Sequence, residues 1–433
     1  MTDHRYFIIG NSAAAVGAIA GIRNTDREGG ITLIAREPHH TYSRPLISYL
    51  LAGTVDESRM PFRPPDFYEA SNVRAVLGTE ATTLDVDART VGTADGRNFT
   101  FEKLLIATGA APIVPSNFAG LQAQGLFTFT TWDDARSIKR FIETTADAPE
   151  RLRAVVVGGG LIGLKAVEAL HALGLDVTMV ELADRILSAS FDQTASDLAR
   201  SALQNAGVDV RCATTVANVH TRDGRIDSVE LTDGTSKPCE LLILAVGVAP
   251  QIALVKNTAV RTDRGILVDE FMQTSVQNVY AAGDVAQATE LLSGQKRPIA
   301  IFPVACRQGF TAGCNMTGER RPYHGGLAKN AVDICGLPTI SVGLTCPEGD
   351  GFEVLSSLDE AGPVYRKLVL KDNRIVGMIF VGCIDRAGII TGLIRQRVDV
   401  SSFKDLLLTD RFGLISLPVE YRKHMVSGAG IEV

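Results

Sequence analysis

Residues 154–165 read AVVVGGGLIGLK, a run of apolar residues that leads directly into four glycines. Small and β-branched residues in such a run are typical of a buried parallel strand. Gly158, Gly160 and Gly163 have the spacing of a dinucleotide-binding turn: the first permits a tight turn, the second lets the backbone approach a pyrophosphate, and the third lets helix and strand pack closely. We therefore expect a strand at 154–157 and then a helix to about residue 173, whose first residues, Leu161 and Ile162, offer free N–H groups to the phosphates.

An acidic residue follows the next strand of this unit. Glu181 closes VTMVE (177–181), 18 residues after Gly163, where a carboxylate can hydrogen-bond the ribose hydroxyls of the adenosine. The same carboxylate repels a 2′-phosphate, so the sequence favours NADH over NADPH. Arg185 lies four residues further on and leaves NADPH open as the alternative.

A second stretch of the same shape, YFIIGNSAAAVGA, occupies residues 6–18. It keeps Gly10 but has Ser12 and Ala15 at the second and third positions, and the Ser12 hydroxyl can itself reach a phosphate. The acid expected after the strand ITLIA is displaced to Glu37. Either Glu37 bends back to a ribose, or Arg36 and backbone groups take that role, or Glu37 is a solvated loop acid.

Composition describes an ordinary globular chain. Of the 433 residues, 45% are hydrophobic and 21% charged, and the net charge of −6 gives no support for nucleic-acid binding. We see no apolar run of the ~18 residues that a membrane helix needs and no secretory signal, so we expect no membrane contact and a cytoplasmic location. The seven cysteines contain no CxxC pair, and the seven histidines have no metal-ligand spacing; no metal site is predicted, and His39 and His40 are expected to face solvent.

Two further features concern helices. Asp133 and Asp134 are predicted to cap the N-terminus of a helix over 133–143, where acids are favourable. After about residue 327 the pattern changes to antiparallel-looking strands with two helices, AGIITGLIRQ (387–396) and SSFKDLLL (401–408). We interpret this part as a separate C-terminal domain.

Three later motifs, ATGAAP (107–112), LAVGVAP (244–250) and VYAAGDVA (279–286), complete the pattern. With the two glycine turns they resemble the FAD/NAD-dependent pyridine nucleotide–disulfide oxidoreductase superfamily. YSRPLISYLLAG (42–53) and QGFTAGCNMTG (308–318) are similar to its rubredoxin- and ferredoxin-reductase branch and to the flavoprotein part of nitrite reductases. One turn then serves FAD and the other NADH.

The resemblance implies a fold class and domain bounds. The fold is α/β, with two Rossmann-like dinucleotide-binding domains plus an α+β C-terminal domain. The FAD-binding domain is discontinuous, 1–115 and 251–326; the NAD-binding domain is 116–250; and residues 327–433 form a domain that caps the flavin and can form a homodimer interface.

The resemblance also implies the roles of individual residues. It implies that the first glycine turn binds FAD, with Arg44 near the pyrophosphate and Ala81 at the adenine. It also implies that Thr108 and Gly109 line the flavin cleft and that Asp284 and Val285 lie along the ribityl chain. A helix starting near Val304 would point its N-terminus at the flavin. The candidate cofactor-binding residues are Gly10, Ser12, Ala13, Ala14, Glu37, Arg44, Ala81, Thr108, Gly109, Asp284 and Val285 for FAD, and Gly158, Gly160, Leu161, Ile162, Gly163, Glu181 and Gly247 for NAD(H).

The chain departs from the family pattern at two places. Where disulfide reductases carry a redox cysteine it has Ser12, Ser43 and Ser48, which predicts no disulfide, coenzyme A disulfide or peroxide chemistry. All seven cysteines are expected to be buried small residues, although the family places Cys335 near the cleft. Lys165 stands where most relatives have a glutamate near the nicotinamide; it either reaches solvent or pairs with a cofactor oxygen or an acidic partner.

The predicted chemistry is hydride transfer from NADH to FAD, which requires no protein acid or base. The leading function is an NADH:acceptor oxidoreductase that passes electrons to a small iron–sulfur protein or a partner subunit. The alternatives are an NADH oxidase that uses O₂, and a flavoprotein interaction subunit or redox-responsive binding protein.

Overall fold

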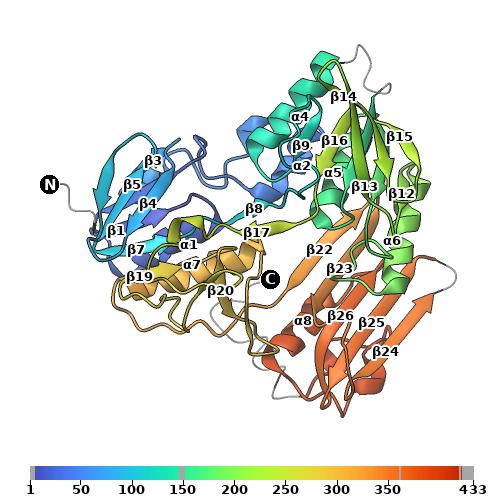
Figure 1. The fold of residues 1–433 in the computed structure, drawn as a ribbon. Coiled ribbons are helices and arrows are strands. Elements are labelled where there is room, and N and C mark those ends of the chain that lie inside the picture. The colour runs from blue at the N-terminus through green and yellow to red at the C-terminus, as the bar shows by residue number, and fades with distance from the viewer. Residues whose placement is uncertain (1–4, 146–151, 360–361, 419–420, 422–433) are drawn as a thin grey trace.

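The computed structural model describes residues 5–145, 152–359, 362–418 and 421. Two units are each built on a five-stranded parallel sheet, and a third, C-terminal unit is built on an antiparallel sheet. Figure 1 shows the first unit in blue and gold, the second in green and the third in orange and red. The α/β fold class is confirmed.

The first parallel sheet has the strand order β19-β7-β1-β2-β3. Its strands are β1 (Tyr6–Ile9), β2 (Ile31–Ala35), β3 (Val73–Leu77), β7 (Lys103–Ile106) and β19 (Val279–Ala281). β1 and β2 are buried along their whole length, as expected for strands that are covered on both faces. Because β19 pairs with β7, the chain returns to this sheet after it has formed the second unit, which is the arrangement that a discontinuous first domain requires.

The second parallel sheet has the order β12-β11-β10-β16-β9. It consists of β9 (Leu126–Thr128), β10 (Arg153–Val157), β11 (Asp176–Val180), β12 (Asp209–Arg211) and β16 (Leu241–Leu244). Its helices are α4 (Trp132–Thr145), α5 (Leu161–Ala172) and α6 (Gln193–Asn205). The strand–turn–helix over 153–172 matches the prediction from the glycine pattern.

Each unit also contains a three-stranded antiparallel meander, which is inserted in the chain between strands of its parallel sheet. β4 (Ala81–Asp85), β5 (Thr90–Thr93) and β6 (Asn98–Thr100) belong to the first unit, and β13 (Val216–Arg222), β14 (Arg225–Leu231) and β15 (Ser236–Pro238) to the second. The two connections between the units, β8 (Ala110–Pro112) and β17 (Val248–Pro250), pair antiparallel with each other in the middle of the molecule (Figure 1). The internal duplication seen in the sequence is thus a duplication of structure.

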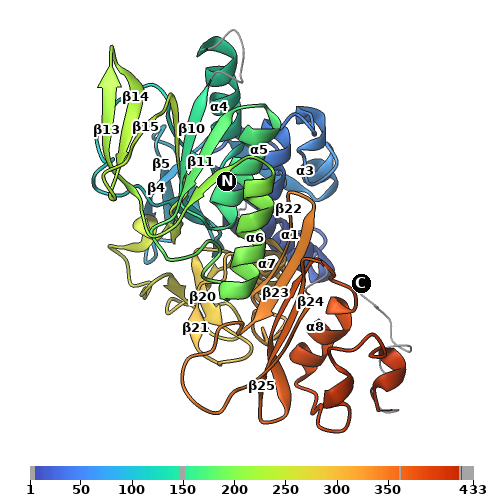
Figure 2. The same cartoon turned by 90° about the vertical axis from the view of Figure 1, so that its right-hand side faces the viewer.

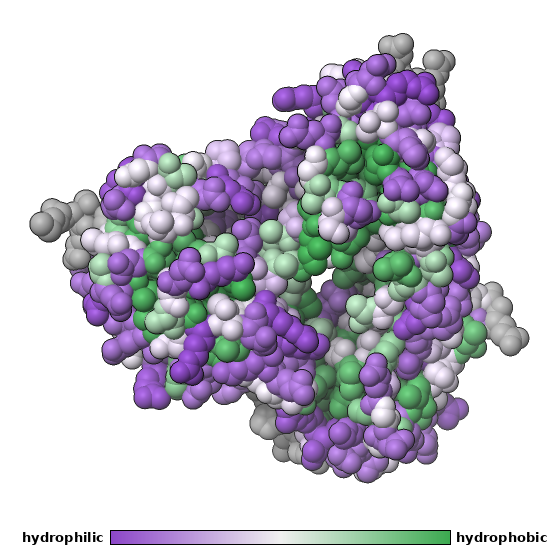
Figure 3. Space-filling model, viewed as in Figure 1, coloured by the Kyte–Doolittle hydropathy of each residue, from purple (hydrophilic) through white to green (hydrophobic). Residues whose placement is uncertain are grey.

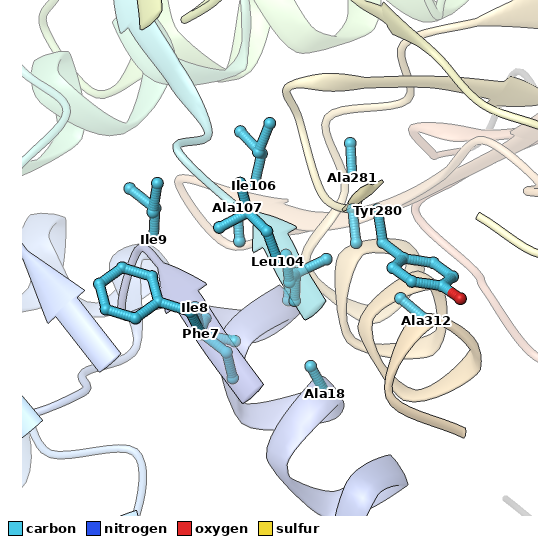
Figure 4. Close-up of a cluster of buried hydrophobic side chains, with 14 of the residues drawn as sticks. Phe7, Ile8, Ile9, Ala18, Leu104, Ile106, Ala107, Tyr280, Ala281 and Ala312 are labelled. Carbon is cyan, nitrogen blue, oxygen red and sulfur yellow. The ribbon is translucent and has the colours of Figure 1, made fainter. Parts of the chain in front are cut away.

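Two helices of the first unit cross at very short distance. α1 (Ala13–Thr25) and α7 (Phe302–Met316) approach so closely that a Cβ on Gly309 would lie 1.9 Å from the Ala14 carbonyl oxygen, and one on Gly17 would lie 2.1 Å from that of Cys306. Figure 4 shows Ala18 of α1 and Ala312 of α7 beneath the strands β1, β7 and β19. Only glycine allows backbones this close, and the crossing fixes where both helices begin.

The C-terminal sheet has the order β22-β23-β26-β25-β24, all antiparallel. Its strands are β22 (Lys329–Ile334), β23 (Leu337–Gly343), β24 (Glu353–Asp359), β25 (Val364–Lys371) and β26 (Arg374–Val381), with α8 (Ala387–Gln396) as predicted. Figures 1 and 2 show α6 of the second unit beside this sheet, and α6 contacts β22 and β26.

Two helix predictions need correction. The segment 401–408 forms only a 3₁₀ turn at Lys404–Leu406, because its N–H groups bond to carbonyls three residues back while Phe403 and Leu407 are already buried. α4 is capped by Thr131 together with Asp134 rather than by Asp133: Thr131 Oγ1 accepts from the Asp134 amide, and the Asp134 carboxylate accepts from the Thr131 amide, each at 3.0 Å. This is a reciprocal capping box.

Candidate active site

A cavity of about 1050 Å³ lies where the three units meet. Small-molecule sites are typically about 300–1,000 Å³, so this one is large enough for an extended ligand. Figure 3 shows a hollow at this junction with hydrophobic residues around it. The wall combines the first glycine turn, the segment after β2, the ends of β7 and β8, the start of α7, the first turns of α5, and β22.

The first glycine turn forms one wall of the cavity. Gly10 has a φ of +120°, and a Cβ there would lie 2.1 Å from the Ala107 carbonyl oxygen, so no other residue fits. Ser12 precedes α1 but makes no side-chain cap. Its hydroxyl and the unbonded N–H groups of Ala13 and Ala14 are therefore available to a ligand at the helix N-terminus.

Asp284 and Arg44 also line the cavity, and Gly283 packs beside the first glycine turn, because a Cβ on it would lie 3.1 Å from the Ala14 Cβ. The Asp284 carboxylate has no hydrogen-bond partner among the described residues; burial raises its pKa, and the nearby Arg44 guanidinium acts in the other direction. Gly283, just before it, donates to Gln308 Oε1 at 2.9 Å. The sequence analysis did not select Gln308 as a site residue. A glutamine on the otherwise apolar face of a buried helix could have indicated it. Val285 is fully buried behind Asp284 and is not among the residues that line the cavity.

The acid after β2 is held within the protein. Glu37 accepts from Tyr42 Oη at 2.5 Å and pairs with Arg44, which also donates to the Thr130 carbonyl at 2.9 Å. Glu37 is therefore not a solvated loop acid; it lines the cavity, held by Tyr42 and Arg44. Arg36 lies 3.8 Å from Glu80, which with Ala81 lines the same end of the cavity.

The connection between the units lines the cavity floor. Thr108 Oγ1 donates to the Gln251 carbonyl at 3.0 Å, and the Gly109 carbonyl accepts from the Gln251 amide at 2.9 Å. These bonds hold the two crossing chains together beside the start of α7. That helix begins at Phe302, two residues before the predicted start, and its residues Phe302, Pro303 and Ala305 line the cavity.

The second glycine turn lies beside the cavity. Gly158 has a φ of +113°, with a hypothetical Cβ 2.4 Å from the Ala245 carbonyl oxygen, and one on Gly163 would lie 1.9 Å from the Gly158 carbonyl oxygen. Gly160 has nothing within 4 Å of its hypothetical Cβ, so this face of the turn is open to a ligand. Leu161, Ile162 and Lys165 of α5 line the cavity itself.

Glu181 is bonded to the second turn. Its carboxylate accepts from the Gly159 amide at 2.5 Å and from the Ala183 amide at 2.7 Å. Arg185 pairs with Asp184 at 2.9 Å. The carbonyl of Gly247 accepts from the Ile113 amide at 2.9 Å, next to the paired strands β8 and β17. Glu181 is thus held at the turn that precedes α5, whose residues Leu161 and Ile162 line the cavity.

Comparison with known proteins identifies this arrangement. A family model described as pyridine nucleotide-disulphide oxidoreductase matches residues 4–309, and one described as rubredoxin NAD+ reductase C-terminal domain matches residues 330–398. The chain belongs to the pyridine nucleotide-disulphide oxidoreductase family. It is an FAD-dependent NAD(P)H oxidoreductase with FAD and NAD(H) as its cofactors.

Proteins similar to this flavoprotein include subunits of larger enzymes and reductases of iron–sulfur proteins. The NADH-dependent phenylglyoxylate dehydrogenase subunit epsilon of Aromatoleum evansii is 34% identical over 405 residues, which cover 92% of this chain and 93% of that one. Nitrite reductase [NAD(P)H] of Bacillus subtilis is 28% identical over 403 residues, which are 93% of this chain but 48% of that protein, so the chain spans about half its length. Among solved structures, the covalent putidaredoxin reductase–putidaredoxin complex has a TM-score of 0.82 at 26% identity, covering 92% of this chain and 94% of that one.

The cavity of this flavoprotein fits FAD. Its volume suffices, the N-terminus of α1 lines it without a side-chain cap, and Asp284 is a partly exposed acceptor without a hydrogen-bond partner among the described residues. Among the described residues that line the cavity, none is a cysteine. Burial raises the pKa of Cys212 and Cys306, so these thiols stay protonated at neutral pH.

Two sequence expectations about side chains turn out differently, and for Lys165 the structure shows one of the alternatives, pairing with an acidic group. Every cysteine was expected to be buried, but only Cys239 and Cys314 are; Cys335 is exposed at the β22–β23 turn, and the other four are partly exposed. His39 and His40 are largely enclosed rather than facing solvent, because this segment passes under α4: His39 stacks on Trp132 at 4.7 Å, and His40 packs on Tyr68. Lys165 donates to Glu168 Oε2 at 2.6 Å and to the Asp333 carbonyl at 2.9 Å, so its partner belongs to the chain itself.

No helix within the described ranges is long and apolar enough to cross a bilayer. No group of three or more His, Cys, Asp or Glu side chains that would hold a metal occurs in the part of the chain that the structure describes.

Proposed function

We propose that this flavoprotein passes electrons from NADH through FAD to an iron–sulfur protein or to a partner subunit that carries such a centre. The observation that carries the proposal is the cavity wall, in which the described residues include serines and no cysteine. Electrons therefore have no thiol to reduce beside the flavin and must leave it directly.

For FAD we assign the first turn, Gly10 with Ser12, Ala13 and Ala14, to the pyrophosphate. Arg44 adds a positive charge there, and its bonds to Glu37 and Thr130 hold it in position. Ala81 belongs to the adenine end, Thr108 and Gly109 to the flavin end, and Asp284 to the ribityl hydroxyls. Val285 would contribute only its backbone, because its side chain is buried behind the wall.

For the nicotinamide nucleotide we assign the pyrophosphate to Gly158, Gly160 and the N-terminus of α5. Glu181 takes the adenosine ribose. Gly163 allows α5 to pack closely on the strand before it. Gly247 belongs to the connection between the first and second units. Leu161 and Ile162 then lead the nucleotide toward the flavin.

When bound, the two cofactors supply hydride transfer from nicotinamide C4 to flavin N5. The protein aligns the two rings in one cavity and excludes water from between them. The N-terminus of α7 faces the same cavity and favours negative charge there. No side chain needs to move a proton in this step.

The surface beside the start of α7 suits an acidic electron carrier. Arg63 and Arg307 lie close enough to Cys306 to lower its pKa against the larger effect of burial. The Arg63 guanidinium lies 4.8 Å from the Phe62 ring centroid, and Phe62 packs edge-on against Phe302 of the cavity wall at 5.0 Å. The two arginines thus place positive charge near the cavity in a chain of net charge −6.

The names of the relatives support the same acceptor class. Putidaredoxin reductase is solved in complex with putidaredoxin, and the Aromatoleum evansii relative is a subunit of a larger NADH-dependent dehydrogenase. We include pairing of two copies through the C-terminal unit in the proposal; the mass of the protein in solution tests it.

The experiment compares acceptors in NADH-driven turnover. With a plant-type [2Fe–2S] ferredoxin as probe, turnover should exceed that with O₂ alone at least tenfold and fall with added salt. The double variant R63Q/R307Q should lose most of the ferredoxin-dependent rate, whereas R140Q on the outer face of α4 should not. Flavin reduction by NADH should be unchanged in all three proteins.

Equal rates with ferredoxin and O₂ would replace the proposal by an NADH oxidase. Flavin reduction slower than one event per minute would favour an interaction subunit whose turnover is incidental.

A further inference from the structure

Lys165 is the α5 residue that brings charge into the cavity. Of the described residues of this helix, Leu161, Ile162 and Lys165 line the cavity, and the first two are apolar. Glu168, which pairs with Lys165 at 2.6 Å, is not part of the lining. The ammonium group of Lys165 therefore belongs to the residue that lines the cavity, and the carboxylate of Glu168 belongs to a residue that does not.

Other charges at this end belong to β22. Lys329 and Asp333 also line the cavity, but both residues are exposed to solvent, and Asp333 Oδ1 accepts from the Gly336 amide at 2.7 Å. The Lys165 side chain is only 24% exposed and is fixed by a second bond, to the Asp333 carbonyl. Its ammonium group is therefore the less hydrated and better positioned of the two cations, and its field is screened less.

The nucleotide changes its charge at this location. With the pyrophosphate at the Gly158–Gly160 turn, its nicotinamide would be held beside Leu161 and Lys165, which line the cavity. When NADH gives up a hydride, two electrons and one proton go to FAD, and the nicotinamide ring changes from neutral to a single positive charge. A fixed ammonium group beside the ring interacts differently with these two states.

We propose that Lys165 discriminates between the two forms of the nucleotide: it repels the cationic ring of NAD⁺ and thereby releases the product of each hydride transfer. The inference rests on the proposed nucleotide site and is independent of the electron acceptor. It assigns opposite effects to the two members of the ion pair. Removing the cation strengthens NAD⁺ binding, whereas removing the partner anion leaves the cation uncompensated and weakens NAD⁺ binding.

Titration calorimetry on the FAD-loaded protein tests this without turnover. Three ligands are compared: NAD⁺, ADP-ribose, which has no nicotinamide, and 1,4,5,6-tetrahydro-NAD, whose ring is neutral and donates no hydride. In K165M the NAD⁺ dissociation constant should fall roughly tenfold, while those of ADP-ribose and the tetrahydro analogue change less than twofold. E168Q should raise the NAD⁺ constant, and K139M, on the outer face of α4, should change none of the three.

Two results would overturn the inference. If K165M leaves the ratio of NAD⁺ to tetrahydro-NAD affinity within twofold, or if NAD⁺ binding weakens, Lys165 is not a source of repulsion. If K165M does not retain FAD, the test rests on E168Q. Unchanged or tighter NAD⁺ binding by E168Q would then contradict the inference. Failure of all three ligands to bind the wild-type protein would instead contradict the proposed nucleotide site, and with it the inference.

Discussion

At the scale of single residues, Asp284 places a carboxylate in the cavity wall, and no described protein group donates a hydrogen bond to it. Burial raises its pKa, and only part of this effect is offset by Arg44. The folded apoprotein thus carries a penalty for the ionised form. This penalty is present above the raised folded pKa and is relieved as the pH falls through that value. A ligand with hydroxyl groups to donate removes it.

Asp284→Asn should separate stability from cofactor binding. Without FAD, the variant should be more stable to urea than the wild type at pH 7, by about 1 kcal/mol, because the carboxylate charge that partial burial disfavours is gone. Its affinity for FAD should fall by roughly 1–3 kcal/mol, since charge-assisted acceptors are lost. Denaturation of the apoprotein and fluorescence titration with FAD measure the two effects. Unchanged FAD affinity would show that the ribityl chain lies elsewhere.

The choice of nucleotide depends on Glu181 and Arg185. NADH should reduce the flavin at least roughly tenfold more efficiently than NADPH, because the Glu181 carboxylate repels a 2′-phosphate and Arg185 is paired with Asp184. In stopped-flow experiments Glu181→Gln should narrow the preference by losing NADH affinity. Asp184→Asn should narrow the same NADH preference by raising the affinity for NADPH, since it frees Arg185 to bind the 2′-phosphate. A wild-type preference for NADPH would refute this assignment.

At the scale of elements, the crossing of α1 and α7 positions both helix N-termini at the cavity. The close approach depends on glycines at matched places on the two helices, including Gly17 and Gly309. The sequence showed these glycines but did not show that the two helices cross at them, because the helices lie almost 300 positions apart in the chain.

Gly309→Ala should therefore be strongly destabilising. Its Cβ would lie 1.9 Å from the Ala14 carbonyl oxygen, so the helices must separate, at a cost of about 3 kcal/mol. We expect lower thermal stability together with loss of FAD, because the Gly10 turn precedes α1 directly. Gly388→Ala in α8 is the matched control: nothing lies within 4 Å of its Cβ, and its stability should be unchanged or slightly higher. Equal behaviour of the two variants would contradict the packing argument.

At the scale of the whole molecule, the second unit is fastened to the C-terminal unit by a shielded ion pair. Asp192, the N-cap of α6, accepts from Lys367 Nζ at 2.9 Å and from Tyr365 Oη at 2.8 Å, both on β25. The two charged side chains are 20% and 10% exposed. Burial acts to raise the pKa of Asp192, but its bonds to Lys367, the Ala195 amide and Tyr365 outweigh burial, and the pKa lies below the usual range.

Asp192→Asn should cost about 3 kcal/mol, because it leaves the Lys367 charge buried without a partner. Since the folded pKa of Asp192 is lowered, its stabilisation is present above the unfolded pKa of about 3.9 and is lost as the pH falls through the folded value. Urea unfolding should therefore show a constant difference between wild type and variant from pH 7 to about pH 4, and the difference should begin to shrink below that pH. Glu353→Gln, which breaks the exposed pair with Lys404, should cost less than about 1 kcal/mol.

The sequence by itself determined the features that depend on local spacing. The two glycine turns, their flanking strands and helices and the acid after β11 follow from residues within about 30 positions of each other, because the geometry of a strand–turn–helix unit is set locally. Asp284 and Thr108 were found through motifs, and they line the cavity. The absence of a cysteine from positions 12, 43 and 48 was also visible in the sequence alone.

Only the tertiary structure decided which groups meet across long separations. It paired Glu37 with Arg44 and Tyr42, brought Lys165 to the carbonyl of Asp333, and placed Gln308 behind the Asp284 turn. Spacing along the chain carries no information about such contacts, because burial and side-chain pairing arise only when separate units pack together. The direction in which Lys165 acts on the nucleotide is therefore a property of the fold, whereas its position in the glycine motif is a property of the sequence.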